Sequence, residues 1–367
     1  MRLFHRNCRG STPMSGADTR EPGDIKEPAI DTAPLAGQDL HSRSQRQPES
    51  EELAMKLDSE RCQFGDPTLA RTVAPEISLV VSTLGRREKL DRLLTSLRAQ
   101  TMRNFEIIVV DQNDPGYLDA VMLRHQGDQR LRHVRSPKGV SLGRNVGAET
   151  ATAPIVGFPD DDCWYDTDVL RKVMARFAAS PQTAVVIGRT VDESGRNSII
   201  PALPEDCTVT KEEVPLVGNA NAVFVRRDVF QRIGQFDLRL GPGAATSFQS
   251  AEDMDLVARL VASDFRSDYF TDLIIRHEQV ETGNNRAYLE RVRKYSLGTG
   301  AFYRKNGYGF ATVALLVLKA IGGIPLRLLR RQPLEIRPKL TYALSLASGY
   351  FLWRENDEAL IPGPPTQ

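Results

Sequence analysis

Short apolar runs alternate with amphipathic stretches between residues 77 and 158. The β-branched run Ile77–Thr83 is too short for a helix and is followed by Gly85, which is typical of a buried strand. The next apolar residues recur at helical spacing, at Leu90, Leu93, Leu94 and Leu97. Further strands are predicted at 105–110, 131–135 and 154–158, with helices at 117–124 and 141–151 between them. This alternation indicates βαβ units, so we expect an α/β fold with a mainly parallel sheet and flanking helices.

The pattern is less regular after residue 206. It predicts a strand at 220–225, a helix at 228–233, a helix that begins at 252, an extended segment to 277 and a helix at 286–305. The C-terminal part is apolar, in two stretches at 311–326 and 340–353. The first stretch is interrupted by Lys319 and Pro325, falls short of the ~20 residues that a membrane span needs, and is followed by arginines. It fits either a helix lying in a membrane interface or a core helix packed on the domain.

Residues 1–72 differ in composition from the rest of the chain. The stretch 11–50 is rich in polar residues, proline and glycine, so it cannot bury enough apolar surface to offset the entropy of ordering. We expect a disordered N-terminal tail, with a short helix near 50–57. The first ten residues are charged and lack an apolar segment, so we expect no secretory signal.

The overall composition narrows the function classes. Because 48 Lys and Arg stand against 47 Asp and Glu, the net charge of +1 gives no electrostatic reason to expect nucleic acid as a partner. The 4 cysteines are far apart and form no C-x-x-C pair, which argues against a cysteine zinc site and against a disulfide framework. The expected compartment is the cytoplasm.

Three adjacent carboxylates, Asp160, Asp161 and Asp162, directly follow the predicted strand 154–158. In an open parallel sheet the ligand crevice lies at the carboxyl ends of the strands, which is where this run falls. Neighbouring carboxylates repel one another, and a bound divalent cation, Mg²⁺ or Mn²⁺, would relieve that repulsion. Since Mg²⁺ is typically held by one or two carboxylates plus substrate phosphates, the run predicts a cation site for a nucleoside diphosphate. The alternative is a solvated acidic turn.

Four other residues are candidates for chemistry. Asp111 ends a predicted strand, where it could accept hydrogen bonds from a base or a ribose; an Asx turn or a helix cap is the alternative. Glu252 and Asp253 open a helix, where a carboxylate could act as general base, although capping and the helix dipole also favour acidic residues there. His277 could ligate a metal or contact phosphate, or be an ordinary surface or core residue.

Several catalytic motifs are absent from the sequence. The first strand is followed by Ser82–Arg87 and not by G-x-G-x-x-G, so a dinucleotide cofactor is disfavoured. The P-loop pattern G-x-x-x-x-G-K-[ST] does not occur, which disfavours a P-loop kinase or ATPase. No paired Ser/His or Cys/His signature supports acyl transfer.

Taken together, these segments resemble the family 2 glycosyltransferases, whose fold is GT-A, a Rossmann-like α/β fold. Six motifs stand in the family's order: Val81–Thr83 with Arg86, Leu93–Thr101, Phe105–Asp114, Gly139–Asp162, Gly218–Asp237 and Ala251–Leu256. The resemblance implies inverting transfer of a sugar from a nucleoside-diphosphate-sugar donor, of the kind that acts in bacterial surface or exopolysaccharide synthesis. Two flanking positions depart from the family, Pro159 where Leu is frequent and Ala251 where Gly is frequent.

The resemblance also implies roles for individual residues. Asp253 matches the catalytic base, and Glu252 matches its neighbour that contacts the acceptor. Asp162 matches the direct metal ligand, with Asp160 and His277 as further candidate ligands. The implied substrate-binding residues are Thr83, Arg86, Asp111, Arg144, Asn145, Asp160, Asp161, Gly218 and Asn219. Among these, Asp111 would contact the nucleobase, whereas Arg144 and Asn145 would lie by the ribose or the diphosphate.

The family's organisation divides the chain after the tail into a GT-A domain at 73–285 and a C-terminal helical region at 286–367. The GT-A domain would have a nucleotide-binding half at 73–165 and an acceptor half at 166–285. The implied partners are a nucleotide-sugar donor and a saccharide or lipid-linked acceptor. Members that act on lipid-linked sugars often carry apolar C-termini, which favours peripheral contact through 311–353 with the inner face of the plasma membrane.

Two other functions share parts of this pattern. A sugar nucleotidyltransferase should show a Gly-rich phosphate loop and a lysine after the first strand, which Arg86-Arg87-Glu88 does not supply. A nucleotide-sugar-binding module without catalytic activity should lack Asp253 or the acidic run, and both are present.

Overall fold

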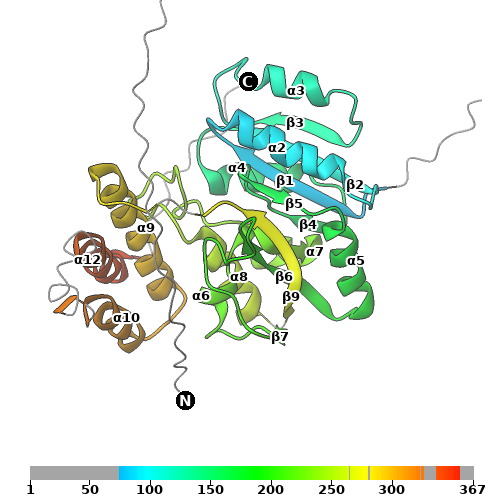
Figure 1. The fold of residues 1–367 in the computed structure, drawn as a ribbon. Helices are drawn as coiled ribbons and strands as arrows, with labels where there is room; N and C mark the ends of the chain where they lie inside the picture. Colours follow the sequence, from blue (N-terminus) through cyan, green and yellow to red (C-terminus); the bar gives the residue numbers. More distant parts are fainter. Residues whose placement is uncertain (1–73, 264, 280–281, 323, 326–335, 356–367) are drawn as a thin grey trace, which may run out of the picture. The chain divides into compact units, whose positions relative to one another are not determined.

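The computed structural model describes residues 74–355 except 264, 280–281, 323 and 326–335. The tail predicted at 1–72 and the helix expected near 50–57 lie outside the described residues. The described residues form an α/β fold in which helices flank one central sheet (Figure 1). The predicted fold class is therefore confirmed.

The central sheet is parallel in one half and mixed in the other. Its order is β3 (Leu131–Arg135), β2 (Phe105–Asp111), β1 (Ile77–Thr83), β4 (Ile155–Gly157), β8 (Val223–Arg226), β6 (Thr183–Val191), β9 (Arg266–His277) and β5 (Cys163–Tyr165), with β7 (Cys207–Thr208) on β9. The first four strands are parallel, as are β6 and β9. Because β8 runs antiparallel to β4 and β6, and β5 and β7 antiparallel to β9, the sheet is mixed, and the mainly parallel arrangement expected from the sequence holds for β3-β2-β1-β4 and for the pair β6 and β9.

Both faces of the sheet carry an apolar core, because successive side chains of a strand point to opposite faces. Ile77, Leu79 and Val81 of β1 pack with the helices of one face, which are α2 (Arg87–Arg98), α3 (Asp119–His125) and α5 (Val169–Ala179). Val80 belongs to the core of the other face. The helices that contribute to this second core include α4 (Val140–Thr150), α6 (Val214–Val217), α7 (Arg227–Ile233), α8 (Glu252–Ala262) and α9 (Arg286–Lys305).

Helix α4 packs unusually close to the sheet because it carries two glycines on its inner side. A Cβ added to Gly143 would lie 2.3 Å from Ser82 Oγ, and one added to Gly147 would lie 2.2 Å from Val80 Cγ1. Neither position has room for a larger residue. This close approach buries the side chains of Arg144 and Asn145, which lie between the two glycines in the sequence.

The C-terminal part contains α9, α10 (Phe310–Gly322) and α12 (Ile336–Leu352), as Figure 1 shows. Helices α9 and α12 meet at two glycines, since a Cβ on Gly300 would lie 2.2 Å from the carbonyl oxygen of Leu346, and one on Gly349 2.1 Å from that of Leu297. Among the described residues, no helix has the length and apolar character that a membrane crossing requires.

No helix or strand is predicted from the sequence between residues 163 and 208. The structure has α5 and β6 there, together with the short strands β5 and β7. The signals for α5 and β6 are in the sequence, because α5 places Val169, Leu170, Val173 and Phe177 on one buried face and β6 is a β-branched run. Strands of two or three residues such as β7 and β5 have no comparable local pattern.

Candidate active site

The carboxyl ends of the parallel strands meet at one edge of the sheet. Thr83 at the end of β1 is the register partner of Asp111 at the end of β2, and the acidic run follows β4. From the other half of the sheet, His277 at the end of β9 pairs with Cys163, the residue after Asp162. The topology therefore brings the predicted donor-side residues to one place.

Asp161 is held by two of the predicted residues. Thr83 Oγ1 donates to Asp161 Oδ2 at 2.7 Å, and Nη1 of Arg86 lies 3.0 Å from Asp161 Oδ1. Burial raises the pKa of Asp161 to about 6, with the neighbouring carboxylates adding to the shift and Arg86 and Thr83 opposing it. The same Nη1 of Arg86 lies 2.8 Å from Asp162 Oδ2. One guanidinium nitrogen thus bridges two carboxylates that would otherwise repel each other.

Asp162 and His277, both predicted metal ligands, form a pair. Nε2 of His277 lies 3.1 Å from Asp162 Oδ1, and its Nδ1 donates to the carbonyl oxygen of Glu278 at 2.5 Å. Burial alone would lower the pKa of His277, but the hydrogen bond and charge of Asp162 outweigh it and raise this pKa. Burial raises the pKa of Asp162, yet His277, Arg86 and Lys89 together lower it. Each of the two groups thus shifts the pKa of the other toward its charged form.

Arg144 is buried and reaches two acids that come from different parts of the chain. Its Nη2 lies 2.6 Å from Asp160 Oδ1, and its Nη1 lies 3.0 Å from Glu252 Oε1. The guanidinium also stacks over the ring of Phe236, 5.1 Å from its centroid. A buried charge is tolerated when it is paired in this way. Arg144 consequently ties the acidic run to the start of α8.

The two acids that begin α8 differ in exposure. Glu252 is buried against Arg144, whereas Asp253 keeps part of its side chain exposed. Asp253 accepts hydrogen bonds from the backbone N–H of Met254 at 2.9 Å and, more weakly, of Ala220 at 3.4 Å. Burial raises the pKa of both carboxyls, and Arg144 opposes both shifts. A partly exposed carboxyl with a raised pKa has the reach and basicity that a general base needs.

The carboxylate of Asp111 is already fully hydrogen-bonded. Oδ1 accepts from the backbone and side-chain N–H groups of Asn113 at 2.9 and 2.8 Å. Oδ2 lies 2.7 Å from Nη1 of Arg135 and 3.1 Å from Nε2 of His133. Burial raises the pKa of Asp111, but these bonds and the charge of Arg135 lower it overall. Sequence reasoning does not single out Arg135 and His133, which lie next to this carboxylate on β3.

Three predicted substrate-binding residues have partners within the protein. Asn145 exchanges two hydrogen bonds, at 3.0 and 2.9 Å, with the backbone of Phe236. Gly218 lies against α8, since a Cβ there would be 2.9 Å from Cα of Met254. Asn219 is buried, and its side chain accepts from the backbone N–H of Asn221 at 3.1 Å. In this structure these three residues contact the protein around the acidic residues of the site, and none of them bonds to Asp160, Asp161 or Asp162.

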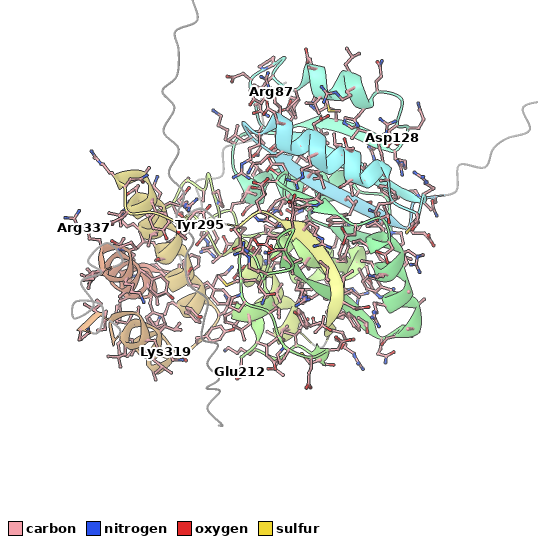
Figure 2. The ribbon with its side chains drawn as sticks, in the orientation of Figure 1. Arg87, Asp128, Glu212, Tyr295, Lys319 and Arg337 are labelled. Atoms are coloured by element: carbon pink, nitrogen blue, oxygen red, sulfur yellow. The ribbon has the colours of Figure 1, made fainter. Side chains whose placement is uncertain are left out.

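Two residues of the site are absent from the sequence prediction. Asn221 reaches the acidic run, because its Oδ1 accepts from the backbone N–H of Asp160 at 2.5 Å, and its Nδ2 is buried with no partner among the described residues. Tyr295 of α9 has its carbonyl oxygen 2.6 Å from Ser250 Oγ, and burial together with the charge of Glu252 raises its pKa (Figure 2). Asn221 lies inside a recognised motif and could have been found; Tyr295 has no local signal.

Comparisons with known proteins identify the part of the chain that holds most of these residues. Residues 78–234 match the family model for glycosyl transferase family 2. This segment is a family 2 glycosyltransferase domain. It includes Thr83, Asp111, Arg144, the acidic run and Asn221, whereas α8 and His277 follow it in the chain.

The curated relatives that match this chain are named as enzymes that transfer sugars. An uncharacterized glycosyltransferase of Haemophilus influenzae is 25% identical over 194 residues, which is 50% of this chain and 62% of that protein. The glucosyl-dolichyl phosphate glucuronosyltransferase of Haloferax volcanii is 30% identical over 189 residues, 45% of this chain and 57% of that protein. The matches thus span between 57% and 62% of the length of these two relatives.

A solved structure shares the fold of the glycosyltransferase domain. The mannosyltransferase PcManGT from Pyrobaculum calidifontis, in complex with GDP-Man and Mn²⁺, matches with a TM-score of 0.53 at 15% sequence identity. The match covers 83% of this chain and 95% of that chain. It confirms the GT-A fold predicted from the sequence.

A divalent cation is common in glycosyltransferases of this fold, and the donor set here fits one. Among the described residues, no group of three or more His, Cys, Asp or Glu side chains is arranged as a metal site. Asp162 and His277 do lie together, with the carboxylate of Asp161 linked to Asp162 through Arg86. One or two carboxylates completed by substrate phosphates are the usual environment of Mg²⁺, so these residues suit a cation that binds with the donor.

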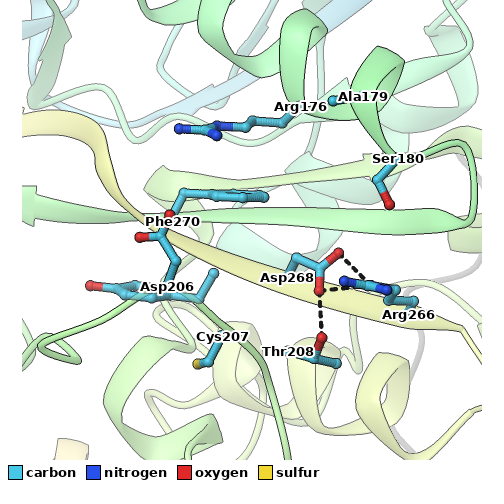
Figure 3. Close-up of a pocket in the computed structure, with 10 residues that line it drawn as sticks. Arg176, Ala179, Ser180, Asp206, Cys207, Thr208, Arg266, Asp268 and Phe270 are labelled. Atoms are coloured by element: carbon cyan, nitrogen blue, oxygen red, sulfur yellow. Dashed lines mark hydrogen bonds and ion pairs between the residues drawn. The ribbon is translucent and has the colours of Figure 1, made fainter.

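A cavity of about 280 Å³ lies elsewhere, between α5, β7 and β9 (Figure 3). It contains none of the predicted site residues. Its charged groups are paired with one another or with neighbours, as Arg266 Nε lies 2.8 Å from Asp268 Oδ2 and Arg176 Nη2 lies 2.7 Å from Asp272 Oδ1. The candidate site of the glycosyltransferase domain is therefore the edge of the sheet and not this cavity.

Proposed function

We propose that the protein is an inverting glycosyltransferase that moves a sugar from a nucleoside-diphosphate-sugar donor to a hydroxyl of a saccharide or lipid-linked acceptor. The observation that carries the proposal is the pair of bonds that Arg144 makes, to Asp160 of the acidic run and to Glu252 beside Asp253. The buried guanidinium of Arg144 thus links Asp160, which is proposed to bind the donor, to Glu252, the neighbour of the proposed general base Asp253. The family 2 domain supports sugar transfer as the chemistry.

The donor would lie along the carboxyl edge of the sheet. Asp111 and its partner Arg135 would meet the nucleobase, and Thr83, Arg86 and Asp161 the ribose and the sugar. Asp162 and His277 would hold Mg²⁺ or Mn²⁺, with Asp160 as a further candidate ligand. When bound, the cation neutralises charge that builds on the departing diphosphate. Lys89, whose Nζ lies 3.9 Å from Asp162 Oδ2, adds a positive charge at the same place.

Asp253 is proposed as the general base. Its carboxylate takes the proton of the acceptor hydroxyl while that oxygen forms a bond to the anomeric carbon, and the diphosphate leaves with the electron pair of the broken bond. Glu252, held by Arg144, would contact the acceptor beside it. Since a single carboxylate acts at the reacting carbon, no covalent glycosyl intermediate is required and the configuration inverts.

The acceptor is proposed to belong to cell-surface or exopolysaccharide synthesis. The Haloferax volcanii relative is named for glucosyl-dolichyl phosphate, a sugar on a lipid carrier, which supports a lipid-linked acceptor. Such an acceptor implies work in the cytoplasm or at the inner face of the plasma membrane.

The test is donor hydrolysis by the purified full chain with Mn²⁺ and a panel of nucleotide sugars. We expect one donor to release its nucleoside diphosphate, and Asp162→Ala to lose this reaction and the Mn²⁺-dependent affinity for the nucleoside diphosphate measured by calorimetry. Asp272→Ala, an acid on β9 that bonds to Arg176, is the matched control and should retain both.

Other outcomes contradict the proposal. Formation of a nucleoside triphosphate and a sugar 1-phosphate from the donor when pyrophosphate is added would instead indicate a sugar nucleotidyltransferase. Donor affinity without turnover, with or without added saccharide acceptors, would indicate a binding module. If no donor binds, the assignment of the acidic run is wrong.

A further inference from the structure

The two outer C-terminal helices carry most of the large apolar side chains that are exposed among the described residues. Of the twelve large apolar side chains exposed among the described residues, seven lie on α10 and α12. They are Phe310, Leu315, Leu318, Leu340, Leu344, Phe351 and Leu352. In α10, a helix of 13 residues, only Val313 is buried. We call this surface the α10–α12 face.

The exposed residues are grouped on two helices that contact each other. Leu340, Leu344 and Phe351 recur at helical spacing along one side of α12, and Leu315 and Leu318 are one turn apart on α10. The two helices meet where the rings of Phe310 and Phe351 lie 5.5 Å apart between centroids. A group of exposed apolar residues, unlike scattered single residues, marks an interaction site.

The α10–α12 face is firmly attached to the glycosyltransferase site. The glycine contacts described above lock α12 onto α9. At the end of α9, Nζ of Lys305 lies 2.8 Å from Oδ2 of the buried Asp255, which belongs to the same helix as Asp253. Ten residues of helix separate Tyr295 from Lys305, a rise of about 15 Å. The face therefore sits a short, fixed distance along α9 from the candidate site.

The charged residues carried by the two helices of the face have one sign. Helices α10 and α12 carry Lys319, Arg337 and Lys339 but no Asp or Glu. Figure 2 shows Lys319 on α10 and Arg337 on α12. An apolar surface rimmed by cations matches the interface of an anionic lipid bilayer, where apolar side chains enter the headgroup region and Lys and Arg meet lipid phosphates.

We propose that the α10–α12 face docks on the surface of an anionic phospholipid bilayer without crossing it. With 13 residues, α10 is only about 20 Å long, short of the ~30 Å hydrocarbon core. A second copy of the chain is the less suitable occupant, because the two faces would bring Lys and Arg against Lys and Arg. Binding to the bilayer does not depend on the proposed function. Its consequence does rest on that function: docking would bring the candidate site to an acceptor carried by a lipid.

The test is flotation of the full chain with vesicles of phosphatidylcholine alone and of equal parts phosphatidylcholine and phosphatidylglycerol. We expect flotation with the anionic vesicles only. Leu318→Glu with Leu344→Glu changes two side chains that are 60% and 69% exposed, so the fold should be kept. Burying each leucine contributes enough free energy that the double variant should partition at least about tenfold more weakly.

The matched control is Leu123→Glu on α3, a leucine that is 64% exposed outside the α10–α12 face. It should float like the wild type, while Lys319→Gln with Arg337→Gln should weaken flotation and lower its salt dependence. Failure of the wild type to float, or equal loss in the Leu123 variant, would overturn the proposal. A concentration-dependent dimer in sedimentation velocity that Leu344→Glu dissolves would assign the face to a second copy instead.

Donor hydrolysis without vesicles separates this proposal from the proposed function. The Leu318 and Leu344 substitutions should leave it unchanged, because neither residue belongs to the candidate site. If hydrolysis is absent from the wild type while flotation occurs, the function is wrong and the docking surface stands. If hydrolysis occurs and flotation does not, the reverse holds.

Discussion

The candidate site and the α10–α12 face depart in opposite ways from the usual distribution of residues in a soluble domain. At the site, Arg144 and Glu252 are charged groups buried in the interior; on the face, Leu318 and Leu344 are apolar groups left in water. Buried charges depend on their partners, so each bond at the site supports the others. An exposed apolar side chain makes few contacts with the rest of the protein, so its replacement disturbs few other residues. Substitutions should therefore lower the free energy of unfolding strongly at the candidate site and only slightly on the α10–α12 face.

The largest effect is expected for Asp253→Asn. The amide keeps the size of the side chain but cannot accept a proton, and loss of a general base typically slows a reaction by ~10²–10⁴. We expect at least a hundredfold slower sugar transfer, with donor affinity and melting temperature near those of the wild type. Transfer at the wild-type rate would make Asp253 only a residue of the first helical turn, and Glu252 the next candidate for the base.

Arg144→Met tests whether the buried network behaves as a unit. It leaves Asp160 and Glu252 without their shared cation, and breaking a buried pair typically costs ~3–5 kcal/mol. Urea unfolding should show a loss of this order in the free energy of unfolding. Arg196→Met removes a surface arginine that pairs with Asp192 and should cost no more than ~1 kcal/mol. Equal losses in the two variants would contradict the comparison.

Gly300→Val tests the attachment between the two regions. The new side chain must push against the carbonyl oxygen of Leu346, and overpacking of this kind typically costs ~1–3 kcal/mol. We expect a lower midpoint in urea, whereas Gly309→Val, at a glycine whose added Cβ would meet nothing within 4 Å, should have a smaller effect. Similar losses would mean that the contact is looser than described.

The pH dependence of stability probes Glu252. Its pKa is raised in the fold, so its carboxyl favours folding below the unfolded-state pKa, and this contribution is lost as pH rises through the folded-state pKa. Lowering the pH from 8 to 5 should therefore stabilise the wild type relative to Glu252→Gln by roughly 1 kcal/mol or more, since one pKa unit corresponds to about 1.4 kcal/mol. A difference that does not change with pH would show that the carboxyl stays ionised throughout.

The smallest effect is expected on the face. Without lipid, Leu344→Glu should change the free energy of unfolding by no more than ~0.5 kcal/mol, as is usual for exposed positions. A large loss would mean that Leu344 is buried by another part of the chain or by a second copy.

The elements around the site were predictable because each is short and locally patterned. The strands 77–83 and 131–135 and the helix 286–305 have the predicted bounds, and the acidic run does follow β4. What the local pattern cannot supply is the partner of a charged group. Arg144 lies between Asp160 and Glu252 because α4 packs closely on the sheet. Gly143 and Gly147 allow this packing, but two glycines in a sequence do not predict it.

Other differences have the same origin. The contact of Asp111 with a nucleobase stays a prediction; the structure adds His133 and Arg135 of β3 as partners of its carboxylate, and pairing between strands cannot be read from one strand. Asn221, which is not among the predicted site residues, reaches Asp160 from the short 3₁₀ helix Ala220–Ala222. The two interpretations of the apolar C-terminus, membrane contact and packing on the domain, both stay predictions.

The glycine contact between α9 and α12 also has a consequence for local opening. Helix α12 cannot leave α9 without breaking the contacts at Gly300 and Gly349, and α9 in turn carries the bond from Ser250 to Tyr295, two residues before Glu252. Among the described residues of α10, Val313 alone is fully buried, and Gly322 makes no close contact of the kind that Gly300 and Gly349 make. In amide hydrogen exchange, α12 should therefore keep its protons as long as α8 does, while α10 exchanges first.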